Sequence, residues 1–312
     1  MSTATRPARA KRVPRYPQQT RLLVATTGGS ESQGALHLAA GLAARGRTTV
    51  LALGVARPFP HATAGLFSLK QPVVLDEESR RDVLENVRRA AGSIEGTEAW
   101  EKRALVGMPD DVINEAATTW RASYVILGMR RHSRLDRLFG GETAVAVARK
   151  TCVPMIAVPP RTRSLPHRAL AAIDFSPASM AAAAAAAKLL DRDGVLVLAH
   201  VQPFAGAVSH EGDFVDVYRS GIEAKLIRAV QTLRRGTRRQ INSVVLDGDP
   251  GPALLAYAKK TGCDLIALGG HDEPLIDRLL LGSVRTKILR EAQCSVLIAP
   301  PAEIACATAP QK

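Results

Sequence analysis

An internal repeat is the feature that most restricts how this chain can fold. A short apolar run ends in glycine at Gly128, and a second run of the same kind ends at Gly269, 141 residues further on. Each run leads through a polar loop, Arg-Leu-Asp-Arg-Leu or Leu-Ile-Asp-Arg-Leu at its centre, into a segment of helical periodicity. Each copy closes with a cysteine and an apolar strand, at Cys152 and Cys294. Self-similarity over this length predicts two domains with one fold.

Within each copy, apolar runs typical of strands alternate with amphipathic segments typical of helices. This alternation predicts an α/β fold: two tandem five-stranded parallel open sheets with helices on both faces, joined by right-handed crossovers. In the first copy a long irregular connection is expected at 56–76, followed by a helix from Glu77. The predicted domains are 21–160 and 168–301, with a proline-containing linker at 161–167 and a tail at 302–312.

The last strand of each domain, at 155–158 and 296–299, would be left as an exposed sheet edge. Exposed edges are usually covered or paired. We therefore expect these two strands to meet at the contact between the domains, so that the halves pack as a pseudo-dimer.

Composition limits the class of protein. A length of 312 residues suits two domains, and 46% hydrophobic with 23% charged residues is typical of a soluble globular protein. No stretch approaches the roughly 20 apolar residues of a membrane span, and the first residues lack the apolar core of a secretory signal. The four cysteines show no C-x-x-C spacing, which favours buried free thiols in a reducing compartment. A cytoplasmic location and no membrane partner are expected.

The net charge of +13 raises the question of nucleic acid binding. Residues 1–20 are strongly basic, with no acidic residue before Glu31, and are predicted to be a disordered, solvated arm. The other cations are spread along the chain, and aromatic residues make up only 4% of it. Nucleic acid is therefore not an expected partner.

The region from Gly269 to Ser283 has the pattern of an anion site. A buried strand ends at Gly269-Gly270, and after a polar loop Gly282-Ser283 opens an amphipathic helix. Backbone N–H groups and the helix dipole then point at one spot, which suits a phosphate. Ser283 can either cap the helix or reach a phosphate oxygen. The plainer alternative is a strand-to-helix loop with an N-cap serine.

Three segments of the second half resemble the universal stress protein family. Residues 172–177, Ala-Ile-Asp-Phe-Ser-Pro, resemble its first-strand signature, and Ala199-His200-Val201 resembles the end of its second strand. Residues 269–283 resemble its nucleotide motif, G-x2-G-x9-G-[ST]. Both halves match in order and length, over 21–160 and 168–300, which indicates the tandem two-domain form. The resemblance implies a sheet order of 3-2-1-4-5, with ATP or AMP bound by some members and not by others.

By the same resemblance, Asp174 contacts the ribose or base and Val201 bounds the adenine. The motif positions retained in this chain are Gly269, Gly282, Ser283 and Val284. Asp272 replaces the second glycine, and its carboxylate would repel phosphate unless it is turned away or bridged by a metal such as Mg²⁺. Asp174 can alternatively be a cap or turn residue.

The first half departs further from the nucleotide motif. Thr27 stands where aspartate is expected, Arg131 replaces the second glycine, and Glu142 replaces the final serine or threonine. A carboxylate at a helix N-terminus satisfies the dipole itself, so this half is predicted to be structural. Its loop at 27–32 also resembles the pyrophosphate loop S-G-G-x-D-S of ATP-dependent ligases, with the first serine and the aspartate altered.

No catalytic constellation is found, because the serine, histidine and cysteine residues form no nucleophile pattern and the histidines show no metal spacing. Three functions stay open. The first is a stress-response regulator that binds ATP or AMP in its second domain, favoured by Gly282-Ser283. The second is a nucleotide-free scaffold that acts through protein partners or as a homodimer, favoured by Asp272. The third, favoured only by the loop at Thr27, is an ATP-using enzyme with at most slow hydrolysis.

Overall fold

The computed structural model describes residues 19–58, 71–129, 142–202, 212–270 and 284–300. Strands and helices alternate along both halves, as the hydrophobic pattern predicted. The first half contains β1 (Thr20–Ala25), a 3-10 turn η1 (Ser30–Ser32), α1 (Gln33–Ala43), β2 (Thr48–Ala56), α2 (Gln71–Gly92), β3 (Glu101–Val106), α3 (Pro109–Thr119), β4 (Tyr124–Gly128), α4 (Glu142–Lys150) and β5 (Met155–Val158).

The second half repeats this order of elements. It contains β6 (Arg168–Ala172), α5 (Pro177–Leu189), β7 (Val195–Gln202), α6 (Gly212–Arg234), β8 (Gln240–Asp247), α7 (Pro250–Thr261), β9 (Leu265–Gly269), α8 (Val284–Glu291) and β10 (Ser295–Ala299). None of the helices in the described ranges is both long and apolar enough to cross a membrane.

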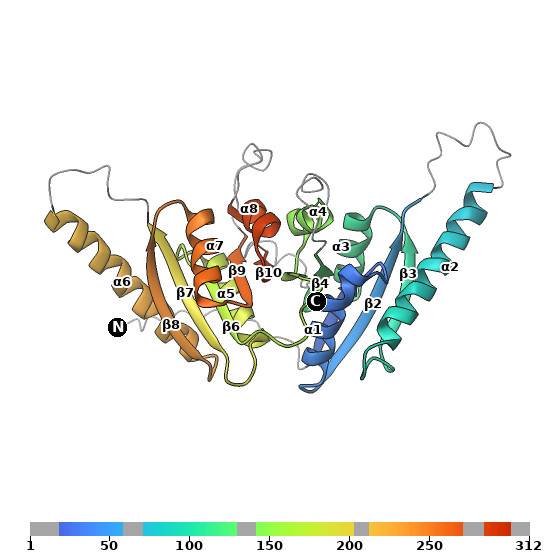
Figure 1. The fold of residues 1–312 in the computed structure, drawn as a ribbon, viewed down its shortest axis with the longest axis horizontal. Helices are drawn as coiled ribbons and strands as arrows, with labels where there is room; N and C mark the ends of the chain where they lie inside the picture. The colour runs from blue at the N-terminus through green and yellow to red at the C-terminus, as the bar shows by residue number, and fades with distance from the viewer. Residues whose placement is uncertain (1–18, 59–70, 130–141, 203–211, 271–283, 301–312) are drawn as a thin grey trace, which may run out of the picture.

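One continuous sheet runs through both halves, in the order β3-β2-β1-β4-β5-β10-β9-β6-β7-β8 (Figure 1). Within each half the strands are parallel and follow the order 3-2-1-4-5, so the predicted fold class and strand order are confirmed. The central strands are apolar at successive positions because helices cover both faces of the sheet. Every residue of β5 and of β10 is buried.

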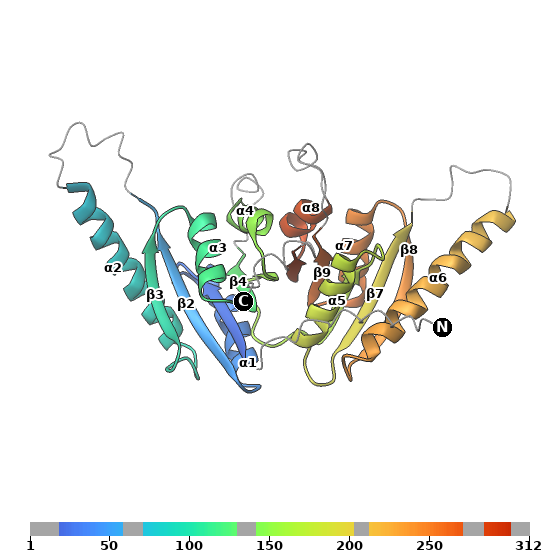
Figure 2. The ribbon, with the colours of Figure 1, turned by 180° about the vertical axis from the view of Figure 1, so that it is seen from behind.

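The two halves meet where β5 and β10 pair antiparallel. Met155 lies opposite Ile298, Ile156 opposite Leu297, and Ala157 opposite Val296. The predicted meeting of the two last strands is therefore confirmed. In both views α2 and α6 lie at the far ends of the molecule, and α4 and α8 lie beside the junction (Figures 1 and 2).

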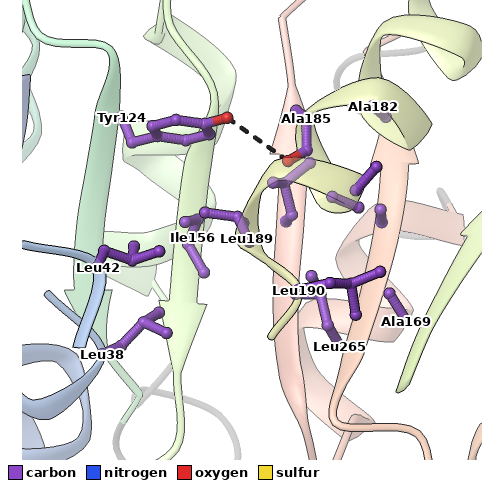
Figure 3. Close-up of a cluster of buried hydrophobic side chains, with 14 of the residues drawn as sticks. Leu38, Leu42, Tyr124, Ile156, Ala169, Ala182, Ala185, Leu189, Leu190 and Leu265 are labelled. Carbon is purple, nitrogen blue, oxygen red and sulfur yellow. Dashed lines mark hydrogen bonds between the residues drawn. The ribbon is translucent and has the colours of Figure 1, made fainter. Parts of the chain in front are cut away.

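Two hydrophobic cores lie on opposite faces of this sheet. Helices α1, α2, α5 and α6 contribute to one core, and α3, α4, α7 and α8 contribute to the other. The first core crosses the junction, where Leu38 of α1 and Leu189 of α5 belong to one cluster (Figure 3). The hydroxyl of Tyr124 donates to the carbonyl oxygen of Ala185 in the other half, at 3.5 Å.

The linker lies along α1, on the face that carries Gly34 and Gly41. A Cβ added at Gly41 would lie 3.1 Å from Leu165, and one added at Gly34 would overlap the carbonyl oxygen of Pro159. Glycine at position 34 lets the backbone at Pro159, just before the linker, approach the helix closely, and glycine at position 41 leaves room for the Leu165 side chain of the linker. The linker is therefore packed on the first half before it enters β6.

Arg45, at the end of α1, binds the end of α5 in the other half. Its guanidinium donates to the carbonyl oxygens of Lys188, Leu189 and Leu190, at 3.4, 3.3 and 2.8 Å. It also lies 3.3 Å from a carboxylate oxygen of Asp191. The last carbonyl groups of a helix lack partners within the helix, so one side chain of the first half supplies donors to the second.

Two details differ from the expectations. Helix α2 begins at Gln71, within the predicted loop at 56–76, because Pro72 falls in its first turn, where proline needs no N–H partner. Cys263 is buried as predicted, but Cys152 and Cys294 are only half-buried, since each lies just before the strand it precedes. All three are free thiols.

Candidate functional site

The turn between β6 and α5 carries Asp174. This exposed residue accepts the Ser176 N–H at its Oδ1, at 2.9 Å. Ser176 then caps α5, because its Oγ accepts the N–H of Ser179 at 3.1 Å, and Pro177 takes the first helical position. Asp174 thus makes the hydrogen bond expected of a turn residue, its alternative role, and its side chain is exposed to solvent.

Gly269 ends β9, which pairs directly with β6. A Cβ added there would lie 2.5 Å from the backbone nitrogen of Ser179 and 2.6 Å from the carbonyl carbon of Ala178. The end of β9 thus lies against the first turn of α5, which directly follows the turn that carries Asp174. Gly128 has the same relation to the first half, since a Cβ there would lie 2.5 Å from the carbonyl oxygen of Glu31. Glycine at this position is therefore a requirement of the fold.

The remaining predicted residues come from two further elements. Val201 lies near the end of β7, half-buried and opposite Leu246. Val284 begins α8 and packs, like Val201, against the core formed by α3, α4, α7 and α8. Gly282 and Ser283 lie outside the described residues, as do Arg131 and Asp272.

Gln202 follows Val201 and is 4% exposed. Its Nε2 donates to Asp247 at 2.5 Å, whereas its buried Oε1 has no hydrogen-bond partner among the residues that the structure describes. Buried acceptors are normally paired. The end of β7 therefore presents an unsatisfied acceptor next to the residue predicted to bound a base.

An aromatic pair beside Asp174 was not anticipated from the sequence. Phe175 has a φ of 67°, in the left-handed region that bulky residues rarely adopt. Its ring lies 4.9 Å, centroid to centroid, from that of His200, whose Nδ1–H donates to the carbonyl oxygen of Ile173 at 2.7 Å. On α6, the ammonium of Lys225 lies 5.6 Å from the Phe175 ring centroid, within range of a cation–π contact.

The first half has glycine at both of these ring positions. Gly28 follows Thr27 as Phe175 follows Asp174, and its φ of 81° is also left-handed. Gly54 of β2 occupies the position of His200 in β7. The residue before Gly54 pairs with Ala25 of β1, just as the residue before His200 pairs with Ala172 of β6.

The two glycines allow α2 to lie directly on the strand ends. A Cβ added at Gly28 would lie 2.7 Å from the backbone of Asn86. One added at Gly54 would lie 2.8 Å from Val87. The rings of Phe175 and His200 fill the matching space in the second half. An alignment of the two repeats that matches Gly28 with Phe175 could have revealed this difference from the sequence.

The first-half turn also contains its own carboxylate. The Thr27 hydroxyl donates to Oε1 of Glu31 at 2.5 Å. A Cβ added at Gly29 would lie 2.7 Å from the same oxygen. The N–H groups of Gly28 and Gly29 donate to the hydroxyls of Thr26 and Thr27, at 3.0 and 3.2 Å. This turn therefore satisfies its polar groups internally, with a negative charge where the second half has Ala178. Glu142, the predicted anion mimic, begins α4.

Comparison with known proteins reflects the duplication within this chain. The profile of the universal stress protein family matches residues 19–159 and again residues 166–300. Universal stress protein YxiE of Bacillus subtilis is 26% identical over 144 residues, which cover 42% of this chain and 97% of that protein. Universal stress protein MJ0531 of Methanocaldococcus jannaschii is 34% identical over 59 residues, and the match spans only 35% of its length.

A solved structure extends the likeness across both halves. The crystal structure of a universal stress protein from Archaeoglobus fulgidus covers 90% of this chain and 96% of its own, with a TM-score of 0.65 and 18% identity. At that identity the likeness concerns the fold. With the two matched segments, it shows that the chain belongs to the universal stress protein family, in its tandem two-domain form.

Proposed function

We propose that this protein is a stress-response regulator that binds one adenine nucleotide, ATP or AMP, in its second half. The observation that carries the proposal is the contrast between the two turns that follow β1 and β6. The first turn is filled by α2 and holds the Glu31 carboxylate. The second has the Phe175–His200 pair, the exposed Asp174 and the Lys225 ammonium. The Glu31 carboxylate of the first arrangement repels an anionic ligand, whereas in the second the Lys225 ammonium offsets the Asp174 carboxylate.

The residues present fit such a ligand. Gly269 brings the end of β9 against α5 with no side chain between them. Asp174 would receive a ribose hydroxyl or a base N–H, and Val201 would bound the base. The unpaired Oε1 of Gln202 offers an acceptor for a further donor of the base. Val284, the first residue of α8, and Gly282 and Ser283, which precede it in the sequence, would supply donors to the phosphates.

Mg²⁺ would enter only with the nucleotide. Among the described residues there is no group of three side chains suited to a metal ion. Mg²⁺ usually combines one or two carboxylates with phosphate oxygens and water, and Asp174 and Asp272 are the candidates. We further propose a cytoplasmic location, on the basis of the free thiols.

Calorimetric titration with ATP and with AMP tests the proposal. Wild type is expected to bind one nucleotide per chain. Gly282→Glu places a carboxylate at the start of α8, and a like-charge contact of several kcal/mol abolishes millimolar affinity. Glu142→Ser is the matched change in the first half. It should leave nucleotide binding in the second half unchanged, or add a weak second site in the first half.

Lys225→Glu isolates the charge beside Phe175. It should weaken ATP more than AMP, because ATP carries more negative charge. Arg228→Glu, an equal charge change one turn along α6, should have a smaller effect. Binding of two nucleotides by wild type, or normal binding by Gly282→Glu, would contradict the assignment. No binding at all would favour the nucleotide-free scaffold, which acts through protein partners.

A further inference from the structure

The far end of the second half carries a concentration of positive charge. No acidic residue occurs between Glu223 and Asp247. This stretch runs along α6 and into β8, beside Arg192 of the α5–β7 loop, whose carbonyl oxygen accepts from Arg239. We call this surface the basic end; its residues are Arg192, Arg228, Arg234, Arg235, Arg238 and Arg239, and Asp191 and Asp193 flank Arg192 in the same loop.

The matching end of the first half shows that the fold does not require these cations. The α2–β3 loop reads Glu95-Gly96-Thr97-Glu98, where the α6–β8 loop reads Arg235-Gly236-Thr237-Arg238. Both loops follow the C-terminus of a long helix, where the dipole favours a cation. The first half nevertheless carries glutamates there, as well as Glu85 on α2. The loop arginines of the basic end are thus a property of the second half alone.

Two arginines of the basic end form hydrogen bonds to backbone carbonyl groups of the protein itself. Arg234 donates to the carbonyl oxygen of Ile241 at 3.1 Å, and Arg239 donates to that of Leu190 at 3.2 Å. Arg235 and Arg238 are exposed and have no hydrogen-bond or ion-pair partner among the described residues. Exposed uncharged side chains with hydrogen-bonding groups occur nearby in the sequence, at Gln231 and Thr232 of α6 and at Ser243 of β8.

We propose that the basic end binds the phosphate backbone of a duplex nucleic acid without reading its sequence. Guanidinium groups bind phosphate oxygens in a bidentate fork, and hydroxyl and amide side chains make the neighbouring contacts. Arg228 lies on α6 and Arg235 directly follows the end of that helix, seven residues further on, a span of about 10 Å in a helix, so they reach different phosphates. This departs from the expectation drawn from whole-chain composition, because the fold gathers these cations on one surface.

Other polyanions fit this surface less well. Single-stranded nucleic acid is held by bases stacked on aromatic side chains, and the basic end has none exposed among the described residues. A membrane surface would take an apolar face beside the cations. Ile227, 54% exposed, is the one large exposed apolar side chain that the described part of this surface offers.

Fluorescence anisotropy with a labelled duplex of ~20 base pairs, two helical turns, tests the proposal on the full chain. The variant Arg235→Ala/Arg238→Ala removes two proposed phosphate contacts. Arg88→Ala/Arg89→Ala removes the same charge at the matching end of the first half, and both proteins keep the basic arm. Thermal unfolding of each variant checks that the fold is retained.

Each lost contact should lower the slope of log K against log salt by about 0.9, so two lower it by about 1.8. Affinity in ~0.1 M salt should then fall roughly sixtyfold for Arg235→Ala/Arg238→Ala and little for the control. An equal loss in both variants would mean that only total charge matters, and would overturn the proposal. So would a wild-type protein that binds no duplex, or that prefers single strands or phosphatidylserine vesicles.

Discussion

Replacing Gly269 by alanine would insert one methyl group between the end of β9 and the first turn of α5. Its nearest neighbours, the Ser179 nitrogen at 2.5 Å and the Ala178 carbonyl carbon at 2.6 Å, are backbone atoms that cannot rotate away. Restoring an ordinary contact of 3.4 Å requires a shift of 3.4 − 2.5, ~0.9 Å. Overpacking costs about 1–3 kcal/mol. A cost of ~2 kcal/mol lowers the Tm by roughly 3 °C for 312 residues that unfold together, at about 2.1 cal/mol/K of unfolding entropy per residue.

Thermal unfolding followed by circular dichroism measures this loss. Gly221→Ala is the control, since nothing lies within 4 Å of the added Cβ in α6 and alanine favours a helix by about 1 kcal/mol. Gly128→Ala, against the carbonyl oxygen of Glu31, should behave like Gly269→Ala. If Gly269→Ala melts with wild type, the packing explanation is wrong. If Gly269→Ala melts with wild type but no longer binds nucleotide, Gly269 is required for ligand binding and not for packing.

Three further changes test other parts of the structure. Arg45→Met should lower the free energy of unfolding, measured in urea, by about 1–3 kcal/mol. The lower figure is expected because the Arg45 side chain is 29% exposed. Arg47→Met is the control, and an equal effect of the two changes would refute a specific role of Arg45. Burial raises the pKa of the Cys294 thiol to about 12 and also raises that of Cys263, so stability should be full below the ordinary value of 9.0 and decline as pH rises from there towards 12. Cys294→Ala should make the decline in the urea midpoint shallower, and an unchanged slope would count against it. Gly34→Ala forces the linker off α1 at Pro159 and should speed proteolysis of the linker, whereas Gly92→Ala, with nothing within 4 Å, should not.

The sequence predicted the fold well because its main determinants are local or repeated. Buried parallel strands appear as apolar runs, and two matching halves implied one topology used twice. The meeting of β5 and β10 followed from a simple requirement, that an apolar edge be covered. The strand order itself came from the family resemblance, since apolar runs alone do not determine which strands are neighbours.

The features that distinguish the halves could not be predicted in this way. The Phe175–His200 pair depends on side chains from different elements and on a left-handed residue that a linear pattern does not show. Arg45 meets the end of α5 only after the two sheets have joined. The basic end was missed because the sequence analysis considered the charge of the whole chain and not its distribution over the folded surface. The motif residues Gly282 and Ser283 stay a prediction.

The antiparallel pairing of β5 and β10 occurs within one chain, so this contact does not depend on protein concentration. A dimer of separate subunits would come apart on dilution, and symmetry would give it two identical sites. Here a change such as threonine at position 27, where the second half has Asp174, alters one site and leaves the other untouched. Covalent linkage thus preserves the paired architecture while allowing each half to diverge separately.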